Sequence, residues 1–200
     1  MIAIIDYGMG NLRSVQKAFE KAGAETVVTQ KASDIKAAQK IVLPGVGAMR
    51  PAMEKLTELG LIPVIKNVVN ENKPFFGICL GFQILFEVGY EGGKVEGLGI
   101  LKGSVEKFTK LKVPQMGWNQ LNISNKNCAI FKNIPDQSNV YFCHSYYVKP
   151  KDQSIIATTT NYGIDYCSSI CSNNIFGVQF HPEKSQEVGL EIIKNFISIE

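Results

Sequence analysis

One cysteine, Cys79, stands between two glycines where a short apolar segment gives way to a helical pattern. The pattern Gly77-x-Cys79-x-Gly81 is typical of a nucleophile elbow, because so tight a strand-to-helix turn leaves room only for glycine. The turn would place the sulfur at the carboxyl-terminal edge of a sheet, where the start of a helix favours a thiolate. We therefore predict that Cys79 is a nucleophile and that the Leu80 N–H faces a developing oxyanion. The remaining cysteines lack this frame and are interpreted as core or surface residues: Cys128, Cys143, Cys167 and Cys171.

A thiol nucleophile needs a general base, and the chain offers only two histidines, His144 and His181. His181 ends an apolar segment, and the proline that follows keeps its backbone extended. Glu183 can return to the imidazole and fix its tautomer, as the third member of a catalytic triad does. His144 lies in an aromatic run without a nearby carboxylate, so a strand histidine satisfied by backbone partners is the simpler interpretation there. The predicted triad is Cys79, His181 and Glu183.

The composition argues against several other classes of protein. With 21 Lys and Arg against 18 Asp and Glu, the net charge is +3, which gives no electrostatic reason to expect nucleic acid or a membrane as a partner. No apolar run is long enough to span a membrane, and no signal-peptide pattern is visible. The cysteines are odd in number and scattered, and Cys167 and Cys171 lack the second pair of ligands that a zinc site requires. We expect a reduced, cytoplasmic protein that uses neither a metal nor a cofactor.

Short apolar segments alternate with helical patterns in the first half of the chain. Strands are expected at 2–5, 25–29, 41–43 and 74–78, and helices at 12–22, from residue 33, and at 49–70 with a break near 60–63. This alternation predicts a mostly parallel central sheet with helices on both faces. The second half reads as strands at 97–108, 113–122, 139–148, 154–159, 164–170 and 174–180, followed by a helix at 185–198. We predict one α/β domain, 1–200, with additional antiparallel strands extending the sheet.

Two motifs together resemble a known family. Cys79-Leu80-Gly81-Phe82-Gln83 and His181-Pro182-Glu183 are similar, in spacing and chain order, to the class I (triad) glutamine amidotransferases. The fold that this resemblance implies is a flavodoxin-like α/β sheet. Further stretches resemble the subfamily of glutaminase subunits that serve imidazole glycerol phosphate synthases: Ile5-Asp6-Tyr7-Gly8-Met9-Gly10-Asn11-Leu12, Pro44-Gly45-Val46-Gly47, Pro114-Gln115-Met116-Gly117-Trp118-Asn119, His144-Ser145-Tyr146 and 179–185. The resemblance covers nearly the whole chain, and Phe82 departs from it, since the family usually has Met there.

The resemblance implies a glutaminase mechanism. The Cys79 thiolate would attack the side-chain amide of L-glutamine, His181 would protonate the departing ammonia, and water would hydrolyse the glutamyl thioester. The Leu80 N–H and a peptide N–H at Val46 or Gly47 would form the oxyanion hole. The glutamine head groups would lie against Gly45, Gln83, His144, Ser145 and Tyr146. The ammonia would pass to a (β/α)₈-barrel cyclase in a heterodimer and enter histidine biosynthesis.

Several alternatives remain at the level of the sequence. A paralogous glutaminase subunit that supplies ammonia for the amidation of a surface sugar would carry the same motifs. A thiol peptidase or a non-catalytic scaffold of the same fold are weaker alternatives, and the intact triad argues against the scaffold. Gly8-Met9-Gly10-Asn11 lacks the third glycine of a dinucleotide fingerprint and no Walker motif occurs, so we expect the ammonia acceptor on another chain. The glycines of the 44–47 loop permit a peptide flip, and we hypothesise that the partner gates hydrolysis there.

Overall fold

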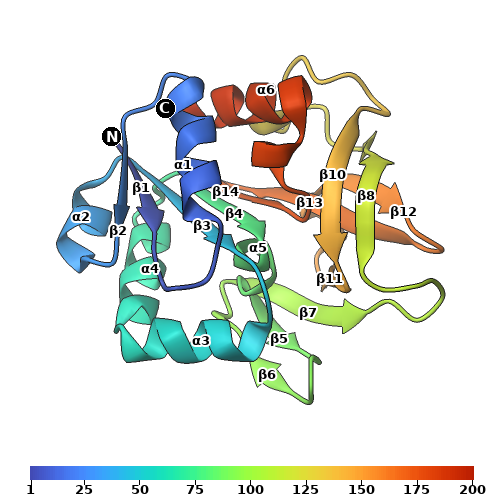
Figure 1. The fold of residues 1–200 in the computed structure, drawn as a ribbon, viewed down its shortest axis with the longest axis horizontal. Helices are drawn as coiled ribbons and strands as arrows, with labels where there is room; N and C mark the ends of the chain where they lie inside the picture. Colours follow the sequence, from blue (N-terminus) through green and yellow to red (C-terminus); the bar gives the residue numbers. More distant parts are fainter.

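Parallel strands form one half of the central sheet. The computed structural model describes residues 1–200 and contains a twelve-stranded sheet, in which the strands β2-β1-β3-β4-β14 run parallel in that order (Figure 1). Their bounds are Ile2–Ile5 for β1, Thr26–Thr29 for β2, Lys40–Gly45 for β3, Phe75–Cys79 for β4 and Ile175–Val178 for β14. The predicted strands of the first half are therefore confirmed. Because β4 and β14 are neighbours, the residues that follow them meet at one edge of the sheet.

The second half of the chain continues the sheet with mostly antiparallel strands. From β14 the order is β13-β11-β7-β5-β6, and β12 and β9 pair beside β13. The pair β5 and β7 is parallel, whereas the other pairs in this half are antiparallel. The bounds are Phe86–Gly89 for β5, Val95–Glu96 for β6, Leu101–Lys107 for β7, Asn122–Ile123 for β9, Tyr146–Pro150 for β11, Ile156–Asn161 for β12 and Asp165–Ser172 for β13.

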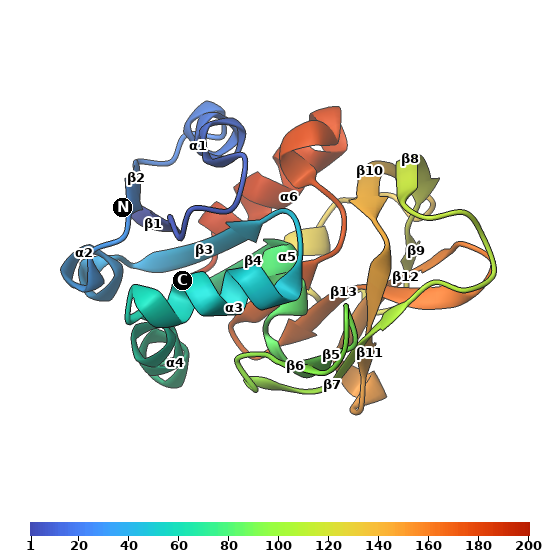
Figure 2. The same cartoon turned by 60° about the horizontal axis from the view of Figure 1, so that its bottom comes forward.

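A separate two-stranded sheet corrects one expectation. The segment 139–148 is two strands that belong to different sheets: β10 (Asn139–His144) pairs with β8 (Gln115–Gln120), and β11 pairs with β7 (Figure 2). Ser145 lies between the two strands. The buried positions Val140, Phe142, His144 and Val148 keep an even spacing across the break. A period of two continues through the switch of sheets, so the sequence pattern reads as one strand.

Helices cover both faces of the parallel strands, as predicted. Helices α1 (Leu12–Lys21) and α6 (Gln186–Ile197) pack in one hydrophobic cluster, while α2 (Ala32–Ala37), α3 (Met49–Glu58) and α4 (Leu61–Asn70) pack in the other (Figures 1 and 2). The Asn11 side chain caps α1 by accepting the Ser14 N–H at 3.4 Å. Gly60, at φ +64°, separates α3 from α4 where the break was expected. None of the helices combines the length and apolar character needed to cross a membrane.

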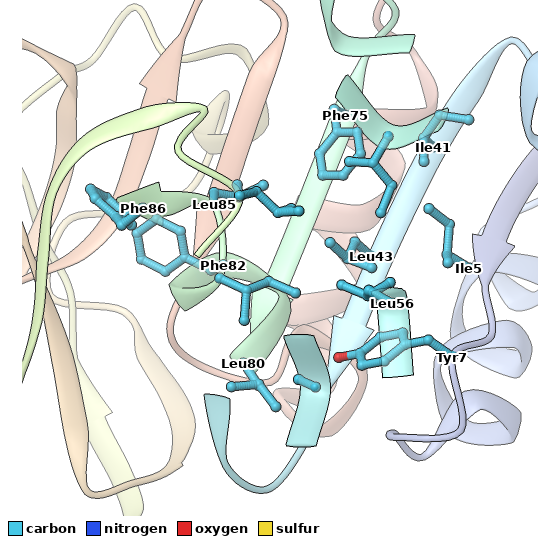
Figure 3. Close-up of a cluster of buried hydrophobic side chains, with 14 of the residues drawn as sticks. Ile5, Tyr7, Ile41, Leu43, Leu56, Phe75, Leu80, Phe82, Leu85 and Phe86 are labelled. Atoms are coloured by element: carbon cyan, nitrogen blue, oxygen red, sulfur yellow. The ribbon is translucent and has the colours of Figure 1, made fainter. Parts of the chain in front are cut away.

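The helix after Cys79 is shorter than its sequence pattern indicates. Helix α5 covers only Leu80–Gln83, and the chain then turns into β5. Backbone bonds from Leu98 to Ile84 and from Ile100 to Leu85, at 2.7 and 2.9 Å, hold the turn, and Leu85 lies in the hydrophobic cluster shown in Figure 3. A short apolar run does not distinguish a helix from a strand. One helical turn carries little dipole, so support for a thiolate must come from other groups.

Candidate active site

The elbow at Cys79 is held by close backbone contacts. Cys79 ends β4 at φ +54°, a conformation rare for a residue with a side chain. A Cβ on Gly81 would lie 1.7 Å from the Leu43 carbonyl oxygen, and one on Gly77 would lie 3.0 Å from the Gly81 oxygen. Gly81 therefore has no room for a side chain, and a side chain at Gly77 would force the backbone at Gly81 to shift. A Cβ on Gly45 would lie 2.1 Å from the buried Tyr7 hydroxyl and 3.0 Å from the Leu80 Cβ, so the 44–47 loop also approaches the elbow closely.

His181 and Glu183 form a buried pair beside the elbow. His181 follows β14, and its side chain is 4% exposed, while that of Glu183 is 2% exposed. The imidazole Nδ1 donates to Glu183 Oε1 at 2.8 Å, which leaves Nε2 for Cys79. Burial alone would lower the pKa of His181, but hydrogen bonds to Cys79 and Glu183 and the negative charges of both partners raise it to about 10. The geometry favours a thiolate–imidazolium pair oriented by a carboxylate.

Ser185 fixes the backbone around this pair. Its hydroxyl donates to the His181 carbonyl oxygen at 2.7 Å and accepts the Tyr141 N–H at 3.0 Å. The His181 N–H in turn donates to the Tyr141 carbonyl oxygen at 2.9 Å. Strand β10 and the segment that carries the base are thereby joined by backbone and side-chain bonds.

A cavity of about 240 Å³ opens at Cys79. Nine of the eleven residues predicted for the site line it: Val46, Gly47, Cys79, Leu80, Gln83, His144, Ser145, Tyr146 and His181. Glu183 stands behind the imidazole, and Gly45 packs against Tyr7, so neither lines the cavity. The structure therefore brings the predicted residues together at one place. A larger hollow of about 990 Å³, between α1, α6 and Trp118, contains neither Cys79 nor His181.

Both ring nitrogens of His144 already have partners. Nδ1 lies 2.8 Å from the Tyr146 carbonyl oxygen, and Nε2 lies 3.2 Å from the Tyr166 hydroxyl. Burial lowers the pKa of His144 to about 4, and the nearby charge of His181 contributes although the bond to Tyr146 opposes it. A neutral imidazole in these contacts positions the Tyr146 backbone. The geometry thus favours the strand-histidine interpretation over direct contact with a substrate.

Two charged residues in the cavity were missed by the sequence analysis, Glu91 and Lys184. Glu91 Oε2 accepts the Met49 N–H at the start of α3 at 3.1 Å. Burial and, after it, the negative charge of Glu91 raise the pKa of Tyr146, which places that charge close to the cavity wall. Lys184 Nζ lies 5.7 Å from the centre of the Tyr141 ring. Glu91 lies in a glycine-rich turn after a strand, where a carboxylate is usually an exposed surface residue. The sequence therefore gives no indication that Glu91 lines the cavity.

Comparisons with known proteins agree with this geometry. Residues 3–199 match the family model described as glutamine amidotransferase class-I. The chain is 52% identical to imidazole glycerol phosphate synthase subunit HisH of Geobacter sulfurreducens, over 98% of this chain and 97% of that protein. It is 47% identical to subunit HisH 1 of Campylobacter jejuni strain RM1221, over the full length of both. A solved glutamine amidotransferase, only 17% identical, superposes with a TM-score of 0.76 over 95% of each chain, which confirms the predicted fold class.

Proposed function

This chain belongs to the class-I glutamine amidotransferase family, and we propose that Cys79, His181 and Glu183 are the residues with which it hydrolyses glutamine. It serves as the glutaminase subunit of an imidazole glycerol phosphate synthase, a function supported by relatives of about the same length that are 47–52% identical. The observation that carries the residue assignment is the hydrogen bond from buried His181 to buried Glu183 beside the Cys79 elbow. Glu183 is the third group of the triad, and this bond orients the base.

The chemistry proceeds in two steps at one sulfur. The Cys79 thiolate attacks the amide carbon of glutamine, and the Leu80 N–H with an N–H of Val46 or Gly47 stabilises the oxyanion. The C–N bond then breaks, and ammonia leaves with a proton from the His181 imidazolium. His181, now neutral, takes a proton from water as the water attacks the thioester. Glutamate and the free thiolate are released, and His181 regains its charge.

The charges around the cavity suit a free amino acid. Glu91 offers a carboxylate to the α-ammonium of glutamine, and Lys184 offers an ammonium at the cavity rim. A volume of about 240 Å³ suits a small molecule better than an extended peptide, which disfavours a thiol peptidase.

Replacing Glu91 with Gln is expected to raise the KM for glutamine about tenfold or more with little change in kcat, because a hydrogen bond to a charged group is lost in the ground and transition states alike. Steady-state glutamate release measures both constants. Glu96→Gln is the matched control, because Glu96 is an exposed carboxylate of β6 that does not line this cavity. A fall in kcat at unchanged KM would show that Glu91 acts otherwise.

The proposed partner is a (β/α)₈-barrel cyclase that receives the ammonia in a heterodimer. The relatives are named as synthase subunits, which supports a partner chain. We place the reaction in the cytoplasm, where a thiolate nucleophile stays reduced. The partner would act on the 44–47 loop, since Gly47 at φ +95° lets the peptide before it rotate to present an N–H to the oxyanion.

The test measures glutamate release by the subunit alone, then with a candidate barrel cyclase and its nucleotide ligand. We expect strong activation by the cyclase and loss of all hydrolysis in Cys79→Ala. Hydrolysis that persists in Cys79→Ala would refute the assignment of the nucleophile. Hydrolysis that depends on Cys79 but is not activated by that cyclase would show that the ammonia serves another acceptor, such as a surface sugar.

A further inference from the structure

A line of buried hydrogen bonds leads from the Tyr146 carbonyl oxygen to the nucleophile. The Gln83 amide nitrogen donates to this oxygen and to Gln179 Oε1, both at 2.9 Å. The Gln179 amide nitrogen donates to the Cys79 sulfur at 3.7 Å. Gln179 is 0% exposed and Gln83 is 6% exposed. The amide of Gln179 therefore bridges the nucleophile and a residue of the cavity wall.

The direction of these bonds is fixed by the first acceptor. A backbone carbonyl can only accept, so Gln83 must turn its nitrogen toward Tyr146. The same Gln83 nitrogen also donates to Gln179, so Gln179 must accept with its amide oxygen. The amide nitrogen of Gln179 is then free to donate to the Cys79 sulfur. The His144 Nδ1–H also donates to the Tyr146 carbonyl oxygen. The orientation of the Gln179 amide thus follows from the chain of bonds and not from the sulfur alone.

We propose that Gln179 is a positioning residue that holds the Cys79 thiolate with a directed N–H. The proposal rests on Cys79 being the nucleophile. Helix α5 has a single turn, so its dipole gives a thiolate little support. The other two stabilising groups are the His181 imidazolium and the N–H of Gln179, which approach the sulfur from different side chains. An N–H that favours the anion also fixes where the sulfur points before glutamine enters the cavity.

The same bonds determine which atom of the Gln83 amide can meet a substrate. Both of its observed bonds use the amide nitrogen, and Gln83 lines the cavity, so its oxygen is free to accept a bond. That oxygen can accept a proton donor of the substrate. The line of bonds that turns the Gln179 N–H toward the sulfur therefore also leaves the Gln83 oxygen free to accept.

The experiment follows alkylation of Cys79 by iodoacetamide across a range of pH, with the site resolved by peptide mass spectrometry. In Gln179→Met the N–H is lost, and we expect the midpoint of the profile to move up by roughly one pH unit. On the acid side of the midpoint this corresponds to about a tenfold slower reaction. Gln179→Glu keeps the volume but replaces the donor with an acceptor, so we expect an upward shift there also.

The matched control is Thr158→Val, which removes two buried side-chain bonds of β12 at a residue that does not line the cavity. It should leave the alkylation profile in place even if it lowers the melting temperature. Unchanged profiles in both Gln179 variants, with the proteins folded by circular dichroism, would overturn the proposal and leave Gln179 as a packing residue. Iodoacetamide does not use the glutamine contacts, so this outcome is distinct from failure of the glutaminase assignment, which Cys79→Ala tests.

Discussion

Glu183→Gln lowers kcat for glutamine hydrolysis by about 10³–10⁴-fold, the size of the loss expected when the orienting carboxylate of a triad is replaced by its amide. The Glu183 Oε1 atom accepts the Nδ1–H of His181, whereas an amide can present N–H there and favour the wrong tautomer. Its second oxygen is buried without a partner, so the carboxylate charge acts on the imidazole with little screening. Glu187→Gln, an exposed carboxylate of α6, is the control and should keep full activity. Single-turnover and steady-state glutamate release measure the effect.

The pH dependence of the same variant has a definite sign. Burial lowers the pKa of His181, and the bonds and charges of Cys79 and Glu183 more than reverse that effect and raise it to about 10. The proton that ammonia needs is present below that pH, so kcat/KM of the native protein should fall on the alkaline side near pH 10. Without the Glu183 charge, less opposes the effect of burial, so the pKa of His181 falls. The alkaline limb of the kcat/KM profile then moves to lower pH. An alkaline limb that stays in place would show that Glu183 does not support the imidazolium.

Gly81→Ala should abolish the elbow. The added Cβ would lie 1.7 Å from the Leu43 carbonyl oxygen, and both groups belong to backbone that cannot turn away as a side chain can. Overpacking of a well-packed site commonly costs 1–3 kcal/mol, so we expect at least about 3 kcal/mol here and a melting temperature lower by roughly 6–12 °C. Glutaminase activity should fall with it, because the same contact sets the position of Cys79.

The control for that variant is Gly92→Ala. Gly92 has a positive φ of +64° but no atom within 4 Å of the added Cβ, so only the backbone conformation is penalised. We expect a loss of about 1 kcal/mol and unchanged hydrolysis. Thermal unfolding followed by circular dichroism compares the two variants. Equal losses at Gly81 and Gly92 would mean that the close approach to Leu43 is not maintained.

The sequence predicts the elements whose signals are local. Asn11 caps α1, Gly60 separates α3 from α4, and Gly81 beside Cys79 lies where a backbone contact allows no side chain. Phe82, the one departure from the family resemblance, is accommodated by tertiary packing: a Cβ on Gly177 would lie 2.1 Å from its ring. Phe82 thus occupies space that a glycine on the neighbouring strand leaves open.

Longer-range features escape prediction for physical reasons. The alternation of buried side chains continues from β10 through Ser145 into β11, so periodicity does not indicate that the two strands belong to different sheets. Glu91 enters the cavity because β5 and α3 bring its turn there, and no residue pattern near it encodes that contact. Gln179 lies two residues before His181, in a motif that predicts a role only for the histidine. Its bond to Cys79 joins residues 100 positions apart, and no local pattern predicts such a contact.

The backbone at Cys79 also restricts the ways in which a lineage of such proteins can change. At φ +54° a β-branched side chain is strongly disfavoured, so threonine is poorly tolerated as an alternative nucleophile. Serine and alanine have no such branch and fit the same turn. A substitution at this position can therefore remove hydrolysis while the fold is kept, which would leave a non-catalytic regulatory subunit. An enzyme of this fold that uses threonine as its nucleophile is not expected.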